Sequence, residues 1–203
     1  MYKRQGDIKY VDRNGDGVIS YEQDRGYVGA AAYPKFVGGL SFSGDWKGID
    51  FSFLFQAGLG RDVALTGVYS RGIMDNTQMT KPFYHGGNSP KYLVENSWRE
   101  DNTNAEFPRL SIVQASSNNA YSSTFWYRSG DYLRLKNLQI GYTFPQKWMS
   151  RIGIDRLRIY FEGQNLWTVS ELTKFNIDPE QPGVSNGYYP QQRIFSFGVN
   201  LAF

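Results

Sequence analysis

The residues best suited to chemistry lie near the start of the chain, in the run DRNGDGVIS. Oxygen-bearing side chains alternate with other residues there, at Asp12, Asn14 and Asp16, and a glycine follows. Calcium loops have this spacing, because alternate side chains wrap a hard cation and the glycine permits a sharp bend. We expect the carbonyl of Val18 and the carboxylate of Asp24 to complete the ligand set. The sequence therefore predicts a Ca²⁺ site in this loop.

The second half of this loop is irregular. Gln23 occupies the twelfth position, where a bidentate acid is the rule, so a one-residue bulge is needed to bring Asp24 to the ion. No amphipathic helix precedes the loop, which argues against a complete EF-hand. The alternative is that N-G-D-G forms a turn from good turn residues and binds no metal.

Catalytic residues are not evident. His85 has no acid or cysteine at ligand spacing, and the chain has no cysteine at all. Glycan hydrolysis would need two acids about 5–10 Å apart in a cleft. The acids that cluster in sequence are Glu95, Glu100, Asp101 and Glu106, and we expect them to be solvated in a polar stretch. The chain is predicted not to be an enzyme.

Strand-like alternation dominates the rest of the sequence. At 193–203 aromatic and aliphatic residues share one parity while small and polar residues share the other, so an extended chain has one apolar and one polar face. The same design predicts strands at about 35–46, 49–59, 131–144 and 156–167. In the third of these the parity changes, which is explained either by a bulge near Asn137 or by an upstream part that lies beyond the bilayer.

Short and long connections alternate between these strands. Transmembrane β-barrels have short turns on one side and long loops on the other. We therefore predict an all-β, antiparallel transmembrane barrel segment at 35–203 with long extracellular loops, and an extracellular loop with the calcium-like turn at 1–34. The alternative is a soluble β-sandwich that binds carbohydrate through exposed aromatic residues. The net charge of +3 comes without Lys/Arg blocks, so no nucleic-acid partner is expected.

Several stretches resemble the C-terminal part of SusC/RagA-type TonB-dependent outer-membrane transporters. They are GDIKYVDRNGDGVI, YPKFVGGLSFSGDWKGIDFSFLFQAGLGRDV, DYLRLKNLQIGYTFP, LRIYFEGQNLWT and YPQQRIFSFGVNLAF, in the family's order. One departure is the spacing after Ile19, where SYEQDR is a residue longer than the family's usual run to the last acid.

The resemblance implies a location in the outer membrane of a Gram-negative, Bacteroidetes-like bacterium. It implies a lipid-embedded barrel that imports oligosaccharides or peptides, energised by TonB and capped by a SusD-like lipoprotein. It also implies that the terminal strand ending in Phe203 is read by the barrel-assembly machinery. The plug, the TonB-interacting segment and an apolar export signal are not evident in the sequence, so we expect the chain to be the tail of a longer protein.

Overall fold

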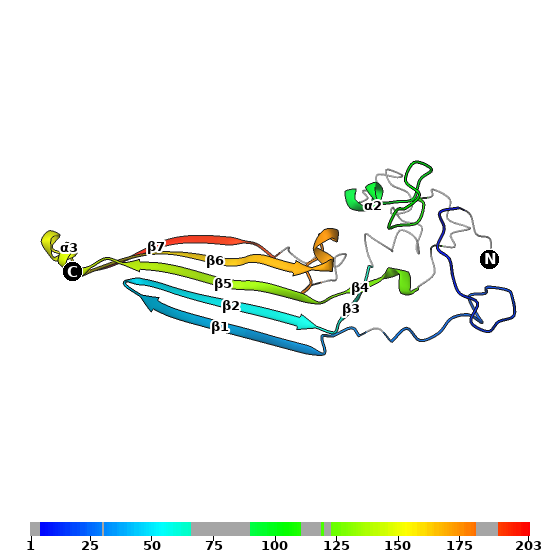
Figure 1. Ribbon diagram of the computed structural model, residues 1–203, viewed down its shortest axis with the longest axis horizontal. Helices are drawn as coiled ribbons and strands as arrows, with labels where there is room; N and C mark the ends of the chain where they lie inside the picture. Colours follow the sequence, from blue (N-terminus) through cyan, green and yellow to red (C-terminus); the bar gives the residue numbers. More distant parts are fainter. Residues whose placement is uncertain (1–4, 30, 66–89, 111–118, 120–122, 182–190) are drawn as a thin grey trace. The chain divides into compact units, whose positions relative to one another are not determined.

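A computed structural model of the chain describes residues 5–29, 31–65, 90–110, 119, 123–181 and 191–203 (Figure 1). These residues form two compact units, which are considered one at a time. Unit 1 comprises residues 1–32, 62–128 and 174–188, and unit 2 comprises 33–61, 129–173 and 189–203. The units are interleaved in sequence, whereas the sequence analysis placed its single boundary after residue 34.

Unit 2 is built on one five-stranded antiparallel sheet with strand order β1-β2-β5-β6-β7 (Figure 1). The strands are β1 (Phe36–Trp46), β2 (Ile49–Leu59), β5 (Tyr132–Thr143), β6 (Arg156–Ser170) and β7 (Ile194–Ala202). Strand neighbours in the sheet are therefore also neighbours in the order in which these five strands occur along the chain. Among the described strands β1 and β7 pair on one side only, so the sheet is open.

The β1–β2 turn has the backbone that a tight hairpin needs. Lys47 and Gly48 both have positive φ, at 51° and 87°. Two consecutive residues with positive φ characterise the type I′ turn, whose twist matches that of the flanking strands. The Thr143 amide donates to the carbonyl of Gly48 at 2.7 Å, which attaches the turn to the end of β5.

A bulge in β5 explains the parity change that the sequence contains. Across from β2, Asn137 pairs with Leu54 and Leu135 with Phe55, so Lys136 is the extra residue. The extra residue returns the upstream leucines to the face that carries Leu138. Strand β6 is irregular at the same level, where Asn165 has a positive φ of 52°.

Short helical turns connect the strands of unit 2. Residues Gln146–Met149 (α3) and Ser150–Ile152 (η4) lie between β5 and β6, and η5 (Glu171–Phe175) follows β6. Within the described ranges, no helix is both long enough and apolar enough to cross a membrane.

Unit 1 has little regular structure and a core of its own. It contains β3 (Asp62–Ala64), α2 (Lys91–Glu95), η3 (Thr124–Trp126) and the start of β4 (Tyr127–Ser129), which pairs with β3. Phe107 packs against Trp126, Phe175 and Tyr92, with ring centroids 6.1–6.4 Å apart. Aromatic residues of this polar stretch therefore pack on one another. His85 lies outside the described residues.

Candidate functional site

The apolar face of the unit 2 sheet is uncovered. Its side chains meet across neighbouring strands, as Phe42 meets Phe53 and Phe161 meets Phe197. Phe197 is 82% exposed and Leu40 is 68% exposed. Others that are exposed on the two edge strands are Phe36, Phe42, Trp46, Phe195, Val199 and Leu201. A water-soluble domain rarely leaves an apolar patch of this extent without a partner.

The opposite face is polar, and its central feature is an ion pair. The Arg158 guanidinium donates to both carboxylate oxygens of Asp50, with Nε 2.8 Å from Oδ2. The pair runs diagonally over Gly141 of the intervening strand. A β-carbon at Gly141 would lie 2.5 Å from Arg158 Nη2 and 2.6 Å from Asp50 Oδ2, so a side chain there would displace the pair.

A second polar group lies nearer the other end of this face. Arg134 is 2% exposed and its Nε donates to Thr168 Oγ1 at 2.9 Å. The Gln56 amide donates to the hydroxyl of Tyr132 at 3.0 Å. Charged groups in a low-dielectric environment require such partners, whereas a wetted wall tolerates Ser, Gln and Asn with few fixed contacts.

The alternation of residues along each strand predicts which face a side chain lies on, but it does not predict these cross-strand contacts. Parity places Arg158 and Glu162 on the polar face. The partnership of Arg158 with Asp50 depends on the register of three strands, two of them separated by about a hundred residues in sequence. The tight β1–β2 turn fixes the register of those two strands only. For the pairing across β2, β5 and β6, opposite charges on the matching parity are the signal that could have suggested the pair.

The loop that carries the predicted Ca²⁺ ligands is closed by its own side chains. Asp12 accepts from the amides of Gly15 at 2.7 Å and Gly17 at 2.8 Å. Asp16 accepts from the Val18 amide at 2.7 Å, and its own amide donates to Asn14 Oδ1 at 3.0 Å. Each carboxylate oxygen keeps lone pairs beyond these bonds, so the donor set suits a hard cation.

The Asp24 carboxylate forms hydrogen bonds with backbone amides at two separate positions in this loop. It accepts from the amides of Arg13 at 2.7 Å and Ser20 at 2.6 Å. These hydrogen bonds, with the nearby Arg13 charge, lower the pKa of Asp24 below its ordinary value. Over the described part of the chain, no three His, Cys, Asp or Glu side chains are placed together as a metal ion would require. Calcium binding here stays a prediction.

Three of the four acids considered for glycan hydrolysis form ion pairs, and the fourth, Glu100, is exposed. Glu95 pairs with Lys91 at 3.5 Å, and Asp101 pairs with Arg99 at 3.1 Å. Glu106 accepts from the Tyr92 hydroxyl at 2.7 Å and from Lys174 at 2.9 Å. Burial acts to raise the pKa of Glu106, but the hydrogen bonds from Lys174 and Tyr92 and two nearby cations lower it below its ordinary value. Glu106 thus joins the segments of unit 1 that contain Tyr92 and Lys174.

Comparison with known proteins relates nearly the whole chain to one class of receptor. It is 28% identical to the TonB-dependent receptor P26 of Formosa agariphila over 98% of its length, and 26% identical to the TonB-dependent receptor SusC of Bacteroides thetaiotaomicron over 96%. These alignments cover 20% and 17% of the two receptors, so the chain spans about a fifth of their length. No family model matches the sequence.

Solved structures agree with the sequence comparison. The RagAB peptide importer in its open-open state aligns with 96% of the chain and 20% of its own, at a TM-score of 0.63 and 25% identity. A second structure of the RagAB peptide transporter aligns with 87% of the chain at a TM-score of 0.60 and 25% identity. The resemblance to TonB-dependent receptors of the SusC/RagA type is confirmed, and the mostly antiparallel β-structure matches their fold.

Proposed function

We propose that the chain forms part of the wall and extracellular mouth of an outer-membrane barrel that imports nutrients with energy from TonB. The observation that carries this proposal is the open sheet of unit 2, with exposed Phe and Leu side chains on one face and a polar face opposite. A lipid-facing and a lumen-facing side alternate in this way in transmembrane barrels.

Strand length and open edges support the same assignment. Strands β1 and β2 have 11 residues each, β5 has 12 and β7 has 9. A tilted strand crosses a bilayer in about 9–11 residues. Each unpaired backbone group costs several kcal/mol in hydrocarbon, so we propose that further strands of a longer polypeptide pair with β1 and β7.

The partners we propose follow from the relatives. TonB would act through segments outside the described sheet, and a SusD-like lipoprotein would cover the mouth. The cargo would be an oligosaccharide or a peptide, and peptide import is what the RagAB structures are named for. We further propose that the barrel-assembly machinery reads the terminal strand through Phe203, which is 86% exposed.

Calcium remains a second proposal, confined to the loop of unit 1. Asp12, Asn14, Asp16, the Val18 carbonyl and Asp24 would hold the ion, which would supply a fixed positive charge that orders the loop. The loop already bends through Gly15 and Gly17, both with positive φ. Protection of the loop from proteolysis by Ca²⁺ tests this without any transport assay.

The competing function is a soluble β-sandwich that binds carbohydrate. A sandwich buries the apolar face of one sheet against a second sheet about 10 Å away. Within the described part of unit 2 there is one sheet, and its phenylalanines face outward uncovered. This arrangement favours the membrane assignment.

Uptake by intact cells tests the proposed function. The full-length gene is deleted, then restored in cells with and without TonB, and import of labelled oligopeptides and oligosaccharides is measured. We expect import of one cargo class to require both the gene and TonB. Import that continues without TonB, or full-length protein that purifies as a monomer without detergent, would contradict the proposal.

A further inference from the structure

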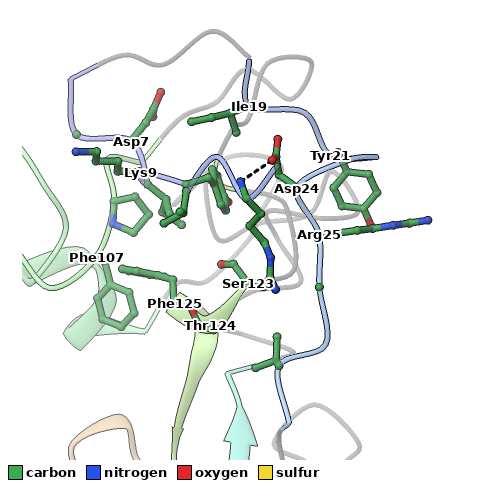
Figure 2. Close-up of a pocket in the computed structure, with 18 of the residues that line it drawn as sticks. Asp7, Lys9, Ile19, Tyr21, Asp24, Arg25, Phe107, Ser123, Thr124 and Phe125 are labelled. Carbon is green, nitrogen blue, oxygen red and sulfur yellow. Dashed lines mark hydrogen bonds between the residues drawn. The ribbon is translucent and has the colours of Figure 1, made fainter. Parts of the chain in front are cut away.

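A cavity of about 900 Å³ lies within unit 1, between the N-terminal segment and residues that follow it by about a hundred positions (Figure 2). Residues 6–11 form one wall and residues 19–28 form another. The third wall comes from residues 98, 105–108 and 123–125. The volume lies in the range of small-molecule sites, which are about 300–1,000 Å³.

Much of the cavity lining is apolar. Aliphatic side chains come from the N-terminal segment and the 19–28 segment, and aromatic rings come from the third wall. The apolar lining includes Ile8, Val11, Ile19, Val28, Phe107 and Phe125. Burial of an apolar ligand group against these side chains would favour binding, because it removes apolar surface from water.

The carboxylates that line the cavity are already engaged. Asp7 is 2% exposed and accepts from Arg109 Nε at 2.8 Å and from Asn119 at 3.1 Å. Asp24 accepts two backbone amides, and Glu106 accepts from Tyr92 and Lys174. Asp7 and Glu106 are therefore already paired with cations, and Asp24 is the one of the three that keeps free lone pairs and, among the described groups, an unpaired charge, which is a small set of acceptors for the hydroxyls of a sugar.

The polar groups that remain available point to a different ligand. Ser123 Oγ is buried on the cavity side of η3, and no described group forms a hydrogen bond with it. Figure 2 shows Ser123 and Phe125 near one another, below Asp24 in the view. A buried hydroxyl without a partner is unfavourable, and a hydrogen bond with a ligand would relieve that cost.

Three cations line the rim. Lys9, Arg13 and Arg25 are exposed, and none of them forms an ion pair with another described residue. Figure 2 places Lys9 and Arg25 on opposite sides of the cavity. With Asp7 and Glu106 paired, these three cations outnumber Asp24, so the net charge that the rim offers to a ligand is positive. A carboxylate at the rim would find charge-assisted donors.

We propose that this cavity binds a peptide through an apolar side chain in its interior and a carboxylate at the cationic rim. The peptide backbone would supply the partner that Ser123 Oγ lacks. This inference rests on the proposed function, since it assigns a cargo class and a recognition site to the loop unit of the importer.

The test uses the full-length protein in detergent and two defined peptides. Acetyl-Leu-Phe-Asp-Glu carries carboxylates, and acetyl-Leu-Phe-Asn-Gln-amide is its uncharged counterpart. Calorimetry should find the acidic peptide bound at least about tenfold more tightly. The double substitution Arg13→Gln and Arg25→Gln should remove this preference, and Ser123→Ala should weaken binding of both peptides.

The matched control is Lys91→Gln, because Lys91 is an exposed cation of unit 1 that does not line the cavity. It should bind both peptides as the unsubstituted protein does. If the double variant misfolds, Arg25→Gln alone serves, since Arg25 is exposed and its guanidinium lies over the Tyr21 ring, with 5.5 Å from Cζ to the ring centroid.

Equal binding of the two peptides, no binding at 1 mM, or unchanged preference in the arginine variants would overturn the peptide site. Tighter binding of trigalacturonate than of the acidic peptide would also overturn it in favour of an acidic sugar. These outcomes leave TonB-dependent uptake intact. Conversely, peptide binding with the expected pattern but uptake independent of TonB would refute the proposed function alone.

Discussion

Replacing Phe197 of β7, which we propose faces lipid, is the sharpest test of the proposed assignment of the two faces of the sheet. Phe197 lies near the middle of β7, is 82% exposed, and packs against Phe161 across the strand pair in a tilted arrangement with ring centroids 5.2 Å apart. Its neighbour Ser196 points to the opposite face, where its cross-strand partner is Glu162. The two residues are neighbours in the same strand, and they differ in the face of the sheet that carries the side chain.

The cost of Phe197→Arg follows from two contributions. An arginine facing lipid near the bilayer midplane destabilises a barrel by about 2–4 kcal/mol. Loss of the aromatic pair adds about 0.5–1.5 kcal/mol. Together they lower the free energy of unfolding by roughly 3–5 kcal/mol, which is at least about a hundredfold in the folding equilibrium.

The matched substitution Ser196→Arg should be tolerated. It places a guanidinium on the polar face beside Glu162, whose carboxylate accepts from Gln164 at 3.1 Å. We expect a change within about 0.5 kcal/mol, as for other solvated positions. The full-length variants are compared by urea titration in phospholipid vesicles and by the amount of folded protein in the outer membrane. Equal damage from both, or greater damage from Ser196→Arg, would refute the assignment of faces.

Three further predictions concern individual contacts. Gly141→Val should disrupt the Asp50–Arg158 pair and reduce the folded fraction of the full-length protein in membranes, whereas Gly141→Ala should do so less; equal effects would contradict the steric argument. Glu106→Gln should destabilise unit 1 by about 1–3 kcal/mol, measured by proteolysis, because two hydrogen bonds lose a charged acceptor. Calorimetric titration should detect Ca²⁺ binding that Asp16→Ala abolishes; absence of heat in the unsubstituted protein would leave the loop as a turn.

The lowered pKa of Glu106 gives unit 1 a defined acid sensitivity. A carboxyl whose pKa is lower in the folded state contributes stability above its unfolded pKa, about 4.3 for Glu. That contribution is lost as the pH falls from there through the lowered folded pKa. Proteolysis of unit 1 should therefore rise below about pH 4.3, and less so in Glu106→Gln. An unchanged acid profile in that variant would assign the effect to other groups.

Strand positions could be predicted from the sequence because alternation is a local signal. Apolar residues alternate with polar or small ones along the strands, which have 9–15 residues, and the parity change in β5 coincides with the bulge at Lys136. Tertiary packing did not have to be known, since lipid or water, and not another layer of the chain, sets the pattern on each face.

Unit 1 could not be predicted in the same way. Its contacts join positions far apart in sequence, as Asp7 does with Arg109 and Ile8 with Asn119. No periodic pattern in the sequence marks these contacts. The polar sequence at 60–130 predicts a long loop, whereas the structure contains β3, α2 and η3 there. Nothing in the sequence around Asp7 indicates that its side chain is only 2% exposed.

The two units therefore depend on different interactions. On the proposed function, the residues that recognise cargo can then change without changing the sheet that forms the barrel wall. The sheet is specified by backbone pairing and two-residue periodicity, so substitutions that keep face and size leave the wall intact. Unit 1 is specified by a few charged contacts at Asp7 and Glu106 that close long loops, and closing a loop costs only about 0.6 kcal/mol more for each doubling of its length. Loop residues between those contacts, including Arg13, Arg25 and Ser123 of the cavity lining, can consequently change while the sheet and the contacts at Asp7 and Glu106 persist. We expect related proteins with different cargo to differ at Arg13, Arg25 and Ser123 before they differ in the wall.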